Sequence, residues 1–105
     1  MIVEYIRYTV ENSKRGDELK KAYSRAARQL DEAAECLSYE LSVCVEDSNS
    51  WVLRIEWDST EAHLQGFRKG PHFLPFLDAI RDFIKEITEM RHYRATDIQA
   101  RKHAS

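Results

Sequence analysis

The sequence is poor in the residues that mark several common kinds of site. Of its 105 residues only three are glycine, two are proline and two are cysteine. It contains no G-x-G-x-x-G or other phosphate-binding loop, which needs glycine where the backbone approaches the phosphate. The two cysteines, Cys36 and Cys44, form no C-x-x-C pair, so we expect free thiols in a reducing cytoplasm.

No charge of one sign dominates, and long apolar runs are absent. The formal net charge is −2, with 16 basic and 18 acidic residues, so nothing indicates a nucleic acid or an anionic membrane as partner. The longest uncharged apolar runs fall far short of the roughly 20 residues that a membrane span requires. The N-terminal residues lack the basic region and cleavage site of a secretory signal, so we expect a cytoplasmic protein.

The composition is that of one soluble globular domain. Hydrophobic residues make up 43% of the chain and charged residues 32%, which is too apolar for a disordered chain. We expect the domain to span residues 1–95. Residues 96–105 form a polar tail without periodicity, either flexible or lying as an arm on a partner subunit.

Apolar periodicity predicts four strands and two helical regions. Alternation of apolar and polar residues predicts strands at residues 2–10, 37–46, 51–58 and 86–94. The clearest helix covers residues 17–35, after a polar loop at 11–16. A second helical region follows Asp58, breaks at Gly70-Pro71 and continues as an apolar stripe to Ile84. This β-α-β-β-α-β order predicts a ferredoxin-like α+β fold with a four-stranded antiparallel sheet.

Several of the predicted strands carry valine, tyrosine, methionine or tryptophan on both faces. A sheet with helices on one face and water on the other does not need apolar residues on both. A second subunit that covers the open face would account for them. The residues therefore indicate a homodimer.

The stretch after residue 55 carries a recognisable pattern. It reads E-W-D-S-x-E-A-H from Glu56 to His63, then G-F-R from Gly66, then H-F-x-x-F from His72. This pattern resembles the antibiotic biosynthesis monooxygenase (ABM) domain family. The resemblance implies a ferredoxin-like monomer that pairs into a dimeric α/β barrel. It also implies a cofactor-independent monooxygenase that uses O2 on a quinol- or phenol-like aromatic substrate, with no metal and no other cofactor.

The resemblance also suggests where the substrate and its proton acceptor would lie. In quinol-oxidising relatives the position that matches His63 holds a polar ring in contact with the substrate. A histidine there could accept a phenolic proton, because its unperturbed pKa lies near neutrality. We therefore expect His63 as the catalytic base, with His72 in reserve, although each could equally be a helix histidine without a role. The expected aromatic walls of the substrate cavity are Trp57, Phe67, Phe73, Phe76 and Tyr39.

Other functions remain as alternatives. The fold could serve as a non-catalytic module that binds a small hydrophobic ligand, or its pocket could be filled by its own aromatic side chains. Haem degradation fits less well, because the chain lacks the family's histidine near Phe76 and its asparagine near Ile6. The antibiotic-oxidising branch has asparagine where this chain has Leu53, so the broad quinol-oxygenase type is the nearest match. The chain has no H-x-x-H or H-E-x-x-H pair, so its spacing of histidines does not indicate a metal site. If the strand face that His92 shares with Met90 and Arg94 is the barrel interior, His92 belongs to the dimer core.

Overall fold

The computed structural model describes residues 1–102, apart from the side chains of Ala62 and Leu64. The elements follow in the order β1 (Ile2–Thr9), α1 (Ser13–Glu32), β2 (Cys36–Val43), β3 (Ser50–Trp57), the π-helix η1 (Ala62–Phe67), α2 (Phe73–Ile80), the 3-10 helix η2 (Arg81–Glu86) and β4 (Ile87–Arg94). All four strands pair antiparallel in one sheet, in the order β2-β3-β1-β4. The predicted ferredoxin-like α+β fold is confirmed.

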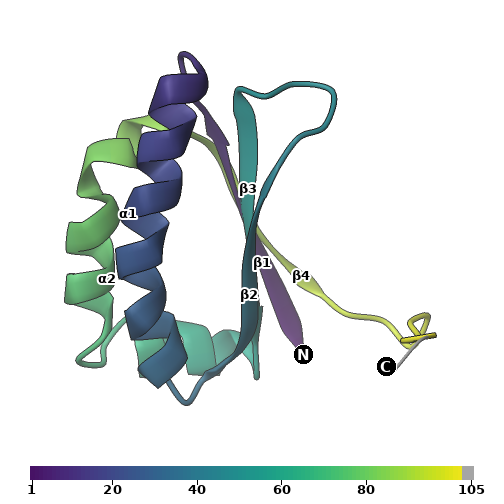
Figure 1. Ribbon diagram of the computed structural model, residues 1–105. Helices are drawn as coiled ribbons and strands as arrows, with labels where there is room; N and C mark the ends of the chain where they lie inside the picture. The colour runs from purple at the N-terminus through teal and green to yellow at the C-terminus, as the bar shows by residue number, and fades with distance from the viewer. Residues whose placement is uncertain (103–105) are drawn as a thin grey trace.

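The helices form a single layer on one face of the sheet. Figure 1 shows α1 and α2 side by side on that face, and none of the helices within residues 1–102 lies on the opposite face. Because strand side chains alternate, every second residue of β1 and β3 points into the space between the layers. The fully buried side chains there include Tyr8, Leu53, Ile55 and Trp57. Alanines at positions 22 and 26 of α1 are also buried, and their small side chains let the helix approach the sheet closely.

The first helix begins earlier than the sequence pattern predicted. It starts at Ser13 instead of residue 17 and ends at Glu32, so the predicted loop at 11–16 is wrong. Asn12 is the reason, because its side-chain oxygen accepts a hydrogen bond of 2.9 Å from the backbone N–H of Arg15. A side-chain cap of this kind replaces one of the hydrogen bonds that a helix start otherwise lacks. The apolar stripe used for the prediction marks only the part of the helix that faces the sheet.

The second helical region is divided into three parts. Its first part, η1, is a π-helix in which the N–H of Arg68 donates to the carbonyl of His63 at 3.0 Å. The chain then breaks at Gly70 and Pro71, as predicted, and resumes as α2 at Phe73. The apolar stripe to Ile84 is not one helix, since α2 ends at Ile80 and η2 follows.

Two further sequence predictions concern cysteines and membranes. Cys36 and Cys44 are unpaired, as predicted. Within residues 1–102, no helix combines the length and the apolar character needed to cross a bilayer.

Candidate functional site

A cluster of three ionisable side chains lies between the sheet and η1. Glu4 of β1 and His92 of β4 are cross-strand partners on the face that carries the helices. His63 enters from η1, and its Nδ1 lies 2.7 Å from Nε2 of His92. The Glu4 carboxylate lies 3.5 Å from Nε2 of each histidine, through Oε1 to His63 and Oε2 to His92. We call Glu4, His63 and His92 the Glu-His-His cluster.

Trp57, the last residue of β3, holds this cluster in place. Its indole N–H donates a hydrogen bond of 3.0 Å to Oε1 of Glu4. Its ring also stacks on the imidazole of His63, with centroids 4.5 Å apart and planes only 11° from parallel. One side chain therefore orients both the carboxylate and a histidine.

Burial dominates the electrostatics of the cluster. Glu4 is 3% exposed and His63 is 4% exposed. Burial raises the pKa of the Glu4 carboxyl, while the hydrogen bond from Trp57 and the charges of His92 and Arg68 lower it. The pKa of His63 is lowered to about 4, mostly by burial and to a lesser extent by the nearby charges of His92 and Arg68. Two imidazoles and a carboxylate in this arrangement are also a donor set that transition-metal ions accept.

The aromatic residues predicted as cavity walls pack mainly against one another. Phe67 lies at their centre, with ring centroids 4.9 Å from Trp57, 5.9 Å from Phe73 and 5.6 Å from Phe76. Trp57 has no exposed surface, and Phe67 and Phe76 are buried. Of the predicted set, Tyr39 lines a cavity of the described structure.

That cavity lies between α1 and the hairpin of β2 and β3. Its volume is about 340 Å³. The lining side chains are Lys20, Tyr23, Ser24, Ala27, Tyr39, Glu40, Leu41, Val43, Trp51 and Leu53. Aromatic and aliphatic groups therefore form most of the wall, with two charged side chains at exposed positions. This volume falls within the range of small-molecule sites.

Hydrogen bonds order the tyrosines of the cavity wall. The hydroxyl of Tyr39 donates to Oδ1 of Asp31 at 2.5 Å, and this bond raises the pKa of Tyr39 to about 12. Tyr23 shares a hydrogen bond with the buried hydroxyl of Tyr8. The indole nitrogen of Trp51 is buried and has no hydrogen-bond partner among the described atoms.

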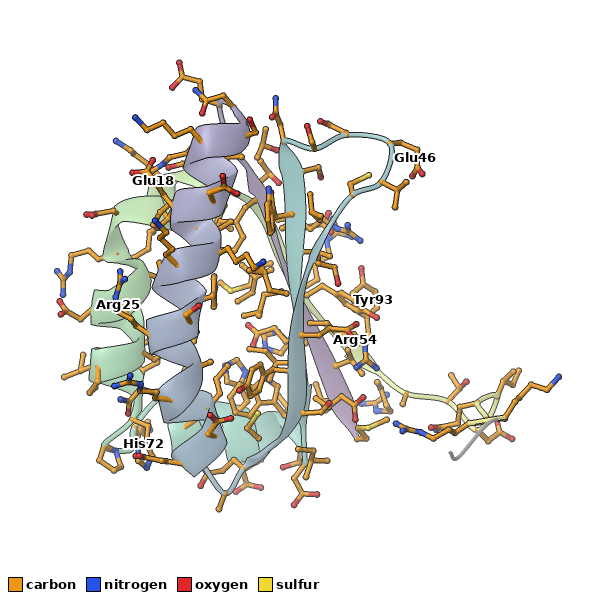
Figure 2. The ribbon with its side chains drawn as sticks, viewed as in Figure 1. Glu18, Arg25, Glu46, Arg54, His72 and Tyr93 are labelled. Carbon is orange, nitrogen blue, oxygen red and sulfur yellow. The ribbon has the colours of Figure 1, made fainter. Side chains whose placement is uncertain are left out.

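The two predicted catalytic histidines belong to different parts of the fold and contact different residues. His63 belongs to the Glu-His-His cluster. His72 lies at the start of α2, with Nδ1 at 3.1 Å from Oε1 of Gln29 and 3.7 Å from a carboxylate oxygen of Glu32. Figure 2 shows His72 at the edge of the helical layer, away from the sheet. Neither histidine is among the residues that line the 340 Å³ cavity.

Sequence reasoning missed Glu4 and His92 as partners of His63. One signal was present, because Glu4 is the only charged residue on a strand face that otherwise carries Ile2, Ile6 and Tyr8. A lone carboxylate on a face that becomes buried needs a partner. Which residue supplies it depends on the pairing of β1 with β4, and this pairing joins residues from opposite ends of the chain.

Comparisons with known proteins agree with this fold. The family model described as antibiotic biosynthesis monooxygenase matches residues 1–79. The Bacillus subtilis (strain 168) protein YczJ is 23% identical over 77 residues, which cover 73% of this chain and 81% of YczJ.

Two solved structures share the fold at low sequence identity. A variant of SnoaB, a cofactor-independent oxygenase from Streptomyces nogalater, superposes with a TM-score of 0.74 at 21% identity over 97% of both chains. A conserved protein from Methanosarcina mazei Go1 gives a TM-score of 0.74 at 16% identity, over 90% of this chain and 92% of the other. At such identities the structural likeness concerns the fold alone, whereas the family model matches most of the sequence. The chain belongs to the antibiotic biosynthesis monooxygenase family.

Proposed function

We propose that the chain is a cofactor-independent monooxygenase that acts on a quinol- or phenol-like aromatic substrate bound in the 340 Å³ cavity. The observation that carries the proposal is the wall of this cavity, where Tyr23, Tyr39 and Trp51 surround an interior also lined by Leu41 and Leu53. Flat aromatic side chains pack well against a planar ring. The family membership and the cofactor-independent relative support the same chemistry.

The protein's contribution to this chemistry is positional and electrostatic. Lys20 lies at an exposed position on the cavity lining, where its ammonium group favours the anion of an acidic phenol. The anion transfers one electron to O2, and the resulting superoxide combines with the substrate radical at a ring carbon that carries hydrogen. The resulting peroxide anion takes up one proton from solvent, which matches the proton that the phenol released, and the hydroperoxide then loses water and leaves a carbonyl group. One oxygen atom enters the product and the other leaves as water, so no external reductant is needed.

The proposal does not require His63 or His72 as the proton acceptor, because neither lines the cavity. An apolar enclosure contributes by excluding water from the reactive intermediates. Lys20 is the residue whose charge the proposal uses. We therefore expect Lys20→Met to lower the rate of oxygen consumption while leaving the fold intact.

Oxygen uptake by the purified protein tests the proposal. A panel of naphthols, anthrones and hydroquinones is assayed with autoxidation subtracted. Ala27→Phe on α1 fills part of the cavity and should abolish protein-dependent uptake, whereas Arg28→Phe places the same side chain at an exposed neighbouring position and should retain it. Equal activity in both variants would rule out this cavity as the site. Ligand-induced quenching of Trp51 fluorescence without oxygen uptake would instead identify a binding module.

A homodimer is part of the proposal. The sheet face without helices carries Val3, which is only 7% exposed, and the edge-to-face pair of Tyr5 and Tyr93, with centroids 5.5 Å apart. Figure 2 shows Tyr93 and Arg54 on this side of the sheet. A second copy packed on this face would bury these rings. Analytical ultracentrifugation should find a dimer that Val52→Glu on this face dissociates and Leu74→Glu on exposed α2 does not.

A further inference from the structure

The Glu-His-His cluster has a composition and shape that the proposed oxygenase chemistry leaves unused. We propose that Glu4, His63 and His92 bind one divalent first-row transition-metal ion. The inference goes beyond the proposed function, because none of the three residues lines the substrate cavity. A metal ion there would be separate from the oxidation and would leave its mechanism unchanged.

The distances within the cluster suit a common metal ion. Ligating atoms from the three side chains all lie within 4.8 Å of one another. Nε2 of His92 lies 2.7 Å from Nδ1 of His63 and 3.5 Å from Oε2 of Glu4. Metal–ligand bonds of about 2.0–2.2 Å place neighbouring ligand atoms roughly 3.0–3.4 Å apart in tetrahedral or octahedral sites. The His63–His92 and His92–Glu4 separations would change by a few tenths of an ångström, and the widest separation, at most 4.8 Å, by at most about 1.4 Å, to bring all three side chains onto one ion.

The charge of the cluster also favours a cation. Glu4 is 3% exposed, and a buried carboxylate is costly unless a positive charge or several hydrogen bonds compensate it. The one hydrogen bond recorded for it in the described part of the chain comes from Trp57. Both histidine contacts to Glu4, at 3.5 Å, are long for hydrogen bonds. Besides His92, the positively charged group that acts on both Glu4 and His63 is Arg68. The side chain of Arg68 is exposed to solvent, which weakens its compensation of the buried carboxylate.

Trp57 has the position of a residue that orients metal ligands. Its indole N–H binds Oε1 of Glu4, which leaves Oε2 directed toward His92. Hydrogen bonds of this kind fix the orientation of a ligating carboxylate and raise metal affinity about 10- to 100-fold. The stacked indole also restricts rotation of the His63 ring. The cluster is therefore preorganised by a residue that makes no contact with the ion.

The donor set indicates the class of metal. Two imidazoles and one carboxylate suit Zn²⁺, Fe²⁺, Co²⁺ or Mn²⁺, whereas Ca²⁺ and Mg²⁺ prefer oxygen donors alone. Three protein ligands leave at least one coordination position for water. The His92 side chain is 33% exposed, so the ion can enter beside β4 from solvent.

Metal binding and thermal unfolding with Zn²⁺ and Co²⁺ test the inference. The full chain is treated with EDTA, dialysed and titrated with each ion. We expect one equivalent bound, a Co²⁺ absorption spectrum with nitrogen ligation, and a rise in Tm of about 10 °C when Zn²⁺ exceeds its Kd about 100-fold. The rise follows because the ion would connect η1 to β1 and β4, which separate on unfolding.

Three variants show whether the bound ion occupies this cluster. Glu4→Gln and His92→Gln each replace one proposed metal ligand and should weaken Zn²⁺ binding at least tenfold. Even the loss of a residue that only orients a ligand typically costs about 10- to 100-fold in affinity. His72→Gln removes a histidine outside the cluster and should bind as the wild type does. Circular dichroism shows whether each variant is folded. If Glu4→Gln does not fold, the Zn²⁺ affinity of His92→Gln alone tests the site. Absence of stoichiometric binding, or equal affinity in all three variants, would overturn the inference without affecting the oxygen-uptake result.

Discussion

The hydrogen bond between Tyr8 and Tyr23 provides a quantitative test of the packing between sheet and α1. The two hydroxyls bond to each other, and the side chains are 0% and 4% exposed. The rings meet edge to face at 5.9 Å, and Tyr23 also contacts Phe76 at 6.1 Å. Replacing either tyrosine by phenylalanine keeps the ring contacts and removes one partner of the buried bond.

The expected effects are not additive. Each single variant leaves one buried hydroxyl without its partner, which costs about 1–3 kcal/mol of the free energy of unfolding. The double variant leaves no orphaned hydroxyl and should be nearly as stable as the wild type. The double-mutant cycle should therefore give a coupling energy of roughly 2–6 kcal/mol in magnitude between Tyr8 and Tyr23, the sum of the two single losses.

Urea unfolding followed by circular dichroism measures these differences. The midpoints should fall in both single variants and recover in the double variant, with an unchanged m-value. Tyr39→Phe is the matched control, because the hydrogen bond of its hydroxyl to Asp31 is exposed and water can replace it, so this variant should change stability by less than about 1 kcal/mol. A double variant that loses the sum of the two single losses would refute the reasoning.

Three further predictions follow from named contacts. Burial raises the pKa of Tyr8 from 10.0 to about 12, so its contribution to stability is complete below pH 10. Above pH 10 the unfolded chain releases the proton first, and Tyr8 alone should lower stability by about 2 kcal/mol by pH 12. Tyr8→Phe should reduce the alkaline loss of stability without abolishing it, because burial also raises the pKa of Tyr23. Gly16→Ala would place Cβ 2.9 Å from Nε1 of Trp51, so thermal unfolding should show a net loss of about 1 kcal/mol despite the better helix propensity of alanine. Asn12→Ala removes the cap on the N–H of Arg15 and should lower stability by about 1 kcal/mol in the same assay; no change would disprove the cap.

Much of the fold was predictable because it depends on local patterns. Alternation along β1 and β3 and the 3.6-residue repeat of α1 are properties of consecutive residues, and they were enough to predict the element order. The break at Gly70 and Pro71 was predictable for the same reason. The start of α1 was not, because a single side-chain cap at Asn12 extends the helix beyond its apolar stripe.

The candidate sites depend on contacts that no local pattern contains. Glu4 and His92 meet only because β4 pairs with β1 in one particular register, and a shift by one residue would place them on opposite faces. The cavity likewise depends on how α1 and the β2–β3 hairpin leave space around Tyr39, which is a matter of side-chain volume. The family, the order of the elements and the faces of the strands could be predicted from the amino-acid sequence, because they depend on neighbouring residues. The meeting of His63 with a buried carboxylate and a second histidine, away from the cavity, could not, because long-range strand pairing and side-chain packing place those groups.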